Sequence, residues 1–211
     1  MTSTIDIKQA RELVRNTRLW PSVNRFLFAF APLVDGERVA ASAGTEAVAL
    51  RGRARVDAFV LERLGVEPTF HTFPASDGSR LLLLKESVYL EVGLWLAALA
   101  DAETLRRAIS KAQVQILKMQ LPNVYPEVLR LAPYFHKWKL PHCDGAYDIA
   151  GLRLLATVLK NVPAALMERQ KLRFPKRLED GFTPLEESLD WEPVKRLLQL
   201  HFPEEYAICC L

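Results

Sequence analysis

A long segment with very few charges lies in the middle of the chain. Residues 81–100 carry only Lys85, Glu86 and Glu91 as charged side chains, and apolar residues fall on nearly every side of a helical projection. A helix that is apolar all round is buried inside a bundle, so the segment predicts a central, buried helix. Gly93 lies within it, and we expect another helix to approach closely there.

The same segment bears on membrane insertion. Its longest nearly apolar run, residues 88–100, is shorter than the roughly 20 residues that a membrane-spanning helix needs, and Glu91 interrupts it. We therefore expect a buried helix here and no direct insertion into a membrane.

An amphipathic pattern follows at residues 101–119, where Asp101 is a suitable N-cap. The apolar residues recur at spacings of four and three, which predicts one helix face turned to the core: Leu105, Ile109, Ala112, Ile116 and Met119. The opposite face is basic. We expect it either to be solvated or to bind an acidic partner surface, with these residues as candidates: Arg106, Arg107, Lys111 and Lys118.

The composition of the 211 residues is that of a globular protein, because half of them are apolar and a quarter are charged. The net charge of +3 is small, and no helix-turn-helix or aromatic-basic pattern accompanies it, so we expect no nucleic-acid partner. Charged residues occur within the first dozen positions, so we expect no signal peptide there. An odd set of three cysteines fits the reducing cytoplasm.

Helical periodicity predominates along the chain. Beyond the central segment it predicts helices at residues 5–17, 22–31, 54–64, 147–160, 163–172 and 193–202, and a further helix start at Thr183, which is followed by Pro184 and Glu186. Residues 40–44 are expected to be weakly structured, and residues 69–73 could form one short strand. The sequence therefore predicts an all-α fold: a single irregular multi-helix domain over residues 1–211, with long proline-rich connections and a subregion at residues 1–44.

Patterns that would indicate chemistry are weak. The mixed set His136, His142, Cys143, Cys209 and Cys210 lacks the paired spacing of a metal site, so we expect no metal and no cofactor. We expect a protein that is not an enzyme. The competing interpretation is a small helical enzyme whose site is assembled from scattered residues such as His71, His136, Asp144 and Asp148.

Charge is unevenly distributed near the C-terminal end. Glu168 is the only acidic residue between positions 153 and 177, which are rich in lysine and arginine, whereas positions 179–205 are mainly acidic. The two blocks could pair within the fold or meet partner surfaces of opposite sign, and the sequence leaves both open.

Several segments together resemble the SctK family, the small accessory adaptors of bacterial type III secretion sorting platforms. They are the apolar helix at residues 81–96 with Glu91 and Gly93, the sequence at 105–109 with its arginine pair, Gln-Lys-Leu-Arg-Phe-Pro at 170–175, and Leu-His-Phe-Pro at 200–203 with cysteines close behind. The resemblance implies a non-enzymatic cytoplasmic adaptor, peripheral to the inner-membrane secretion apparatus. It would bridge the cytoplasmic domains of the inner-membrane ring to the spoke-forming pod protein.

Overall fold

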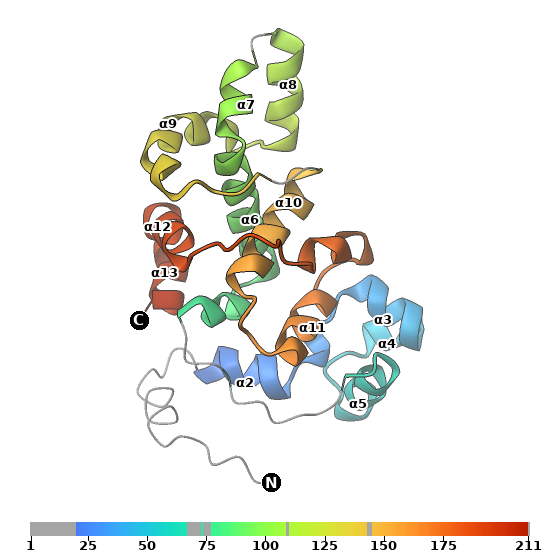
Figure 1. Ribbon diagram of the computed structural model, residues 1–211. Helices are drawn as coiled ribbons and strands as arrows, with labels where there is room; N and C mark the ends of the chain where they lie inside the picture. The colour runs from blue at the N-terminus through green and yellow to red at the C-terminus, as the bar shows by residue number, and fades with distance from the viewer. Residues whose placement is uncertain (1–19, 67–72, 74–76, 109, 143–144, 211) are drawn as a thin grey trace. The chain divides into compact units, whose positions relative to one another are not determined.

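The protein is built from helices. A computed structural model describes residues 20–66, 73, 77–108, 110–142 and 145–210 (Figure 1), and within these ranges it contains α-helices and short 3-10 helices but no strand. The all-α prediction is confirmed. The predicted helix at 5–17 and nearly all of the strand at 69–73 lie outside the described residues. No helix among those described is both long enough and apolar enough to cross a membrane.

The chain divides into two compact units, and each is made from two separate stretches. Unit 1 comprises Met1–Leu83 and Val162–Glu179, and unit 2 comprises Leu84–Asn161 and Asp180–Leu211. The prediction of one domain over residues 1–211, with a subregion at 1–44, is not tested by this division and stays a prediction.

Unit 1 contains short helices from both ends of the sequence. They are α2 (Trp20–Phe28), η1 (Ala31–Leu33), α3 (Gly36–Ala43), α4 (Thr45–Ala49), α5 (Ala54–Arg63), η2 (Asp77–Leu83) and α11 (Ala164–Leu172), with η4 (Lys176–Phe182) at its boundary. The prediction that residues 40–44 are weakly structured is wrong. The Asp35 carboxylate accepts hydrogen bonds from the backbone N–H groups of Glu37 and Arg38, and this cap begins α3.

Two buried arginines, Arg169 in α11 and Arg173 at the C-terminal end of this helix, connect segments of unit 1. The Arg169 guanidinium donates to the carbonyl oxygens of Phe26 and Leu27, at 3.2 and 2.6 Å, in the last turn of α2. Arg173 donates to the carbonyl oxygen of Leu82 at 2.7 Å. The last carbonyls of a helix have no partner within the helix, so these side chains replace water as their donors.

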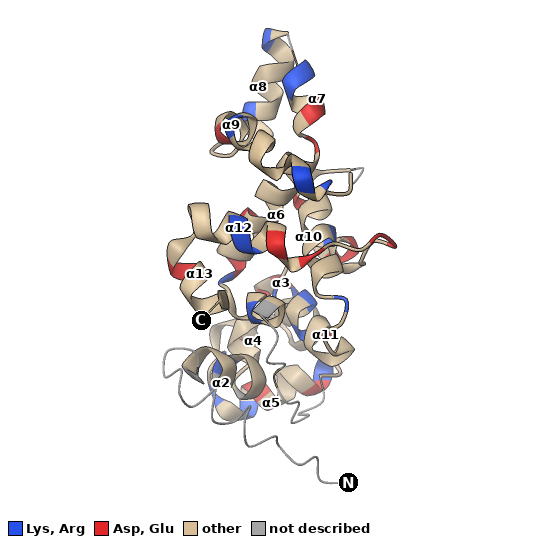
Figure 2. Ribbon diagram, turned by 60° about the vertical axis from the view of Figure 1, so that its left-hand side comes forward, with Lys and Arg blue, Asp and Glu red and all other residues tan. Residues whose placement is uncertain are grey.

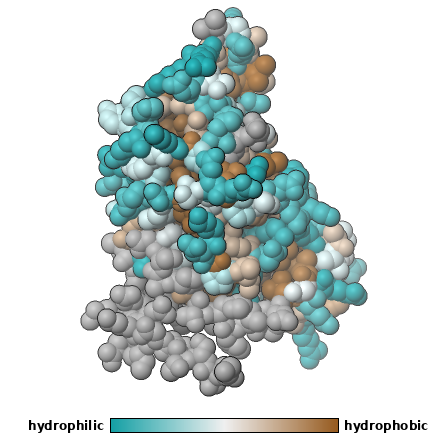
Figure 3. Space-filling view, in the orientation of Figure 1, coloured by the Kyte–Doolittle hydropathy of each residue, from teal (hydrophilic) through white to brown (hydrophobic). Residues whose placement is uncertain are grey.

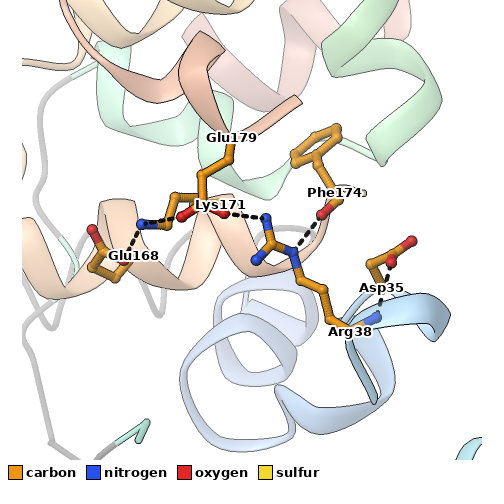
Figure 4. Close-up of polar contacts among 6 residues, drawn as sticks. All are labelled: Asp35, Arg38, Glu168, Lys171, Phe174 and Glu179. Atoms are coloured by element: carbon orange, nitrogen blue, oxygen red, sulfur yellow. Dashed lines mark hydrogen bonds and ion pairs between the residues drawn. The ribbon is translucent and has the colours of Figure 1, made fainter. Parts of the chain in front are cut away.

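The exposed side of α11 carries an ion-pair network (Figure 4). Lys171 lies 2.8 Å from the Glu168 carboxylate and 3.2 Å from that of Glu179, which also lies 3.4 Å from Arg38. The hydrogen bond from Lys171, with the positive charges of Lys171 and Arg38, lowers the pKa of Glu179. Arg38 also donates to the Phe174 carbonyl oxygen at 2.7 Å. Lys171 of the basic block at 153–177 therefore pairs with Glu179 of the acidic block, and part of the basic block is buried.

Unit 2 is organised around α6 (Glu86–Ala100), which crosses α10 (Tyr147–Val158). Most of α6 is buried, as predicted, and Gly93 faces Gly151 of α10 at the crossing. The remaining helices of the unit are α7 (Ala102–Arg107), α8 (Lys111–Gln120), α9 (Tyr125–Phe135), η3 (His136–Trp138), α12 (Trp191–His201) and α13 (Pro203–Cys210). The close approach predicted at Gly93 is confirmed.

The predicted helix start at Thr183 is wrong, because residues 183–190 are not helical. A cap at Thr183 would bind the backbone N–H of residue 185 or 186. The Leu185 N–H instead donates to the side-chain oxygen of Thr157 at 2.9 Å, and Thr157 is fully buried in α10. A tertiary hydrogen bond thus replaces the local cap, and the helix begins only at Trp191.

Candidate functional site

The predicted continuous helix at 101–119 is two helices. The chain leaves the helical conformation at Ala108, and Ser110 caps the next helix, α8. The Ser110 hydroxyl accepts from the Gln113 N–H at 3.1 Å, and the Gln113 side chain accepts from the Ser110 N–H at 3.2 Å. This reciprocal capping box has a sequence signature, Ser-Lys-Ala-Gln at 110–113, which could have located the break.

The apolar face predicted to lie in the core is mainly exposed. Leu105 is buried in α7, and Ile109 lies outside the described residues, but α8 contains no buried residue. Ile116 and Met119 are 50% and 72% exposed to solvent, and Ala112 is exposed beside them. Figure 3 shows apolar surface over α8 at the top of the view. The core assignment was therefore wrong for Ala112, Ile116 and Met119, because α8 packs on no second helix strongly enough to cover them.

The four basic candidates all lie on α7 and α8, where Figure 2 shows the lysine and arginine positions. Arg107 is highly exposed and forms an ion pair with Glu103 at 3.3 Å. Lys111 begins α8, and Lys118 lies in its last turn. A lysine in the first turn interacts unfavourably with the positive end of the helix dipole, and α8 has no acidic residue in its first turn to offset this charge. The structure brings Arg106 to a pocket that the other three do not line.

This pocket has a volume of about 480 Å³ and lies among α6, α7, α9 and the segment that follows α9. Its lining combines apolar and basic side chains: Leu99, Ala100, Ala102, Glu103, Arg106, Ala132, Pro133, Phe135, His136, Lys139 and Leu140. The sequence did not indicate this pocket, because its lining comes from two segments, residues 99–106 and 132–140, that are far apart in the sequence and share no pattern. We name it the α7–α9 pocket.

Next to this pocket, Asp101 has a role other than the predicted cap. Its side chain makes no capping hydrogen bond to α7. One carboxylate oxygen accepts from the Tyr147 hydroxyl at 2.7 Å, and the other lies 3.8 Å from His142 Nδ1. Burial, together with the hydrogen bond and the negative charge of Asp101, raises the pKa of Tyr147. The contact joins the start of α10 to the end of α6.

The residues of the enzymatic alternative are only partly described. His71 and Asp144 lie outside the described residues. His136 lines the α7–α9 pocket, and Asp148 lies in the first turn of α10, where its carboxylate accepts from the Ile149 N–H.

For the metal set, Cys143 lies outside the described residues, Cys209 is buried in α13 and Cys210 follows it. In the described part of the chain, no three His, Cys, Asp or Glu side chains gather closely enough to hold an ion.

Comparison of the chain with protein-family models, curated proteins and solved structures finds no match. The resemblance to the SctK family therefore depends on the sequence motifs. Within the fold, the motif at 170–175 includes the buried Arg173, and Gly93 lies at the crossing of α6 and α10. The arginine pair of the 105–109 motif ends α7, beside the exposed helix α8.

Proposed function

We propose that the chain is a non-enzymatic cytoplasmic adaptor of a bacterial type III secretion sorting platform. It bridges the cytoplasmic domains of the inner-membrane ring to the pod protein that forms the spokes. The sequence resemblance to the SctK family supports the system and the partners. One structural observation supports the mode of action, namely the exposed apolar face of α8 with two lysines beside it.

The apolar face of α8, composed of Ala112, Ile116 and Met119, binds the pod protein. Single exposed apolar residues are ordinary, but these three follow one another along one face of a helix in which no residue is fully buried. Covering a large apolar side chain contributes roughly 1.5–3 kcal/mol, so Ile116 and Met119 are suitable anchors for a partner helix.

The charge of α8 selects the kind of partner. Residues 111–120 contain Lys111 and Lys118 and no acidic residue, and Arg106 and Arg107 precede them. Two copies of α8 would bring like charges together, whereas an acidic surface would complement them. The partner surface on the pod protein is therefore apolar in its centre and rimmed with aspartate and glutamate.

The test is co-purification of the tagged full chain with the pod protein and with the ring's cytoplasmic domain, both taken from the same secretion system. We expect the wild-type chain to retain both. Met119→Glu and the double change Arg106→Glu with Arg107→Glu should weaken binding to the pod protein about tenfold or more while folding is preserved. Arg55→Glu, an exposed change in α5, is the matched control and should bind normally.

A wild-type chain that binds neither partner contradicts the proposed function. Folded α8 variants that assemble and secrete like the wild type would instead place the interface elsewhere. The next candidates are the exposed members of the basic block at 153–177, namely Lys160, Lys176 and Arg177, because Arg169 and Arg173 are buried.

A further inference from the structure

The α7–α9 pocket has an apolar interior and a basic rim. Leu99, Ala102 and Phe135 are almost completely buried and contribute apolar surface. Arg106, His136 and Lys139 are exposed and contribute nitrogen atoms, against the single carboxylate of Glu103. Such a lining fits a ligand group that is apolar at its end and negatively charged beside it.

The positive charge of the rim is not neutralised within the described fold. The Glu103 carboxylate forms its ion pair with Arg107, which does not line the pocket. Within the described ranges, Arg106 and Lys139 have no carboxylate within ion-pair distance. Two permanent positive charges therefore flank an apolar depression, and an acidic ligand would complement both.

The backbone at Lys139 is a second, independent observation. Lys139 has φ 46° and ψ 56°, and it is the only residue other than glycine with a positive φ in the described part of the chain. This left-handed conformation costs about 1 kcal/mol or more for a residue with a side chain. Glycine or asparagine would be the usual choice at the end of a helix. Lys139 thus places its charge at the rim from a backbone position that glycine would adopt with less strain.

The size of the pocket limits what it can receive. A volume of about 480 Å³ lies toward the lower end of the roughly 300–1000 Å³ typical of binding pockets. It accommodates one or two side chains but not a helix. A single apolar anchor that fills a pocket with a polar rim is a common arrangement in protein interfaces.

We propose that the α7–α9 pocket binds an acidic segment of the pod protein, inserting one apolar side chain whose neighbouring carboxylates pair with Arg106 and Lys139. This inference rests on the proposed function and adds to it a second contact, separate from the apolar face of α8.

The experiment measures the dissociation constant of the purified pod protein for the full chain and its variants. Arg106→Glu and Lys139→Glu reverse the rim charges, and Ala100→Phe fills the pocket without changing charge. Each should weaken binding about tenfold or more. Arg130→Glu is the matched control, because it changes the same residue type at an exposed position of α9 outside the pocket, and its effect should stay below about threefold.

A crosslinking arm identifies the bound segment. A photoreactive phenylalanine analogue in place of Leu140, which lines the pocket, should crosslink to the pod protein at a stretch containing an apolar residue beside Asp or Glu. The same analogue in place of Tyr134, which is 68% exposed on α9 outside the pocket, should not. Circular dichroism and melting temperature establish that every variant is folded.

Two outcomes overturn the proposal in distinguishable ways. If the wild-type chain does not bind the pod protein, the proposed function fails and this inference fails with it. If the wild type binds, Met119→Glu weakens it and the three pocket variants bind like the wild type, the pocket assignment alone is wrong. A crosslink at Tyr134 equal to that at Leu140 has the same meaning.

Discussion

Gly151 and Gly93 bring the backbones of α10 and α6 into direct contact. A Cβ atom added to Gly151 would lie 2.3 Å from the carbonyl carbon and oxygen of Gly93, and one added to Gly93 would lie 3.1 Å from the carbonyl carbon of Gly151. The contact is asymmetric. Position 151 has no space for a side chain, whereas position 93 is only tight.

This asymmetry predicts different costs for two equivalent substitutions. Gly151→Ala must separate the helices and should lower the free energy of unfolding by roughly 3 kcal/mol. For Gly93→Ala, the strain is offset by an alanine helix propensity that is about 1 kcal/mol better, so the change should stay within about 1 kcal/mol of the wild type. Urea denaturation measures both. Gly36→Ala, where the nearest atoms are 3.9 Å away, is the unstrained control. Equal costs at positions 93 and 151 would contradict the crossing geometry.

Removing the Arg173 guanidinium should destabilise unit 1. Arg173→Met retains much of the volume but leaves the buried Leu82 carbonyl oxygen without this donor, and we expect a loss of about 2–4 kcal/mol in the free energy of unfolding. Lys176→Met, at an exposed position nearby, should change it by less than about 0.5 kcal/mol. If both variants melt alike, Arg173 does not stabilise the unit.

Ser110→Ala should act locally. The substitution removes the capping box of α8, worth about 1 kcal/mol to a helix, but α8 buries no residue and contributes little to global stability. Hydrogen exchange of the backbone amides at 111–120 should therefore become several times faster while the melting temperature stays nearly constant. A clear fall in melting temperature would mean that α8 is packed more firmly than its exposure indicates.

His201 should make stability depend on pH near neutrality. Its ring stacks on Trp95 with centroids 4.3 Å apart, and burial lowers the pKa of His201 below its usual 6.5. The unfolded chain therefore takes up a proton at a higher pH than the folded one, so stability is full above about pH 6.5 and falls as the pH drops through that value. His201→Phe keeps the stacked ring and should abolish this component. Denaturation at pH 7.5, 6.5 and 5.5 provides the comparison, and an unchanged slope in the variant would exclude His201 as its source.

Periodicity located the helices whose packing is simple. The uniform apolar character of α6 and the leucine spacing of α10 are direct consequences of burial, so both were predictable. At Ser110 and Thr183, by contrast, similar cap sequences had opposite outcomes. The Ser110 cap forms, but the Leu185 N–H that a Thr183 cap would use is bound by the distant Thr157. When a distant residue takes the backbone N–H that a cap would use, nothing in the neighbouring sequence indicates it.

The candidate site was only partly predictable. The basic residues of α7 and α8 were identified, but exposure of Ile116 and Met119 was not, because periodicity indicates a face without indicating what covers it. The burial of Arg169 and Arg173 was also unexpected, since arginine is rarely buried unless its donors find partners. Those partners are carbonyl groups more than 80 residues away in the sequence.

The placement of α11 has a consequence for biosynthesis. Helix α2 and the segment up to Leu83 leave the ribosome long before Arg169 and Arg173, whose guanidinium groups bind the carbonyl oxygens of Phe26, Leu27 and Leu82. Unit 1 therefore cannot be completed during translation until the central helices of unit 2 have already emerged. Until α11 is synthesised, the N-terminal part of unit 1 lacks these contacts and stays incompletely folded. A ribosome stalled before α11 would therefore hold an N-terminal segment whose apolar surface chaperones can still bind.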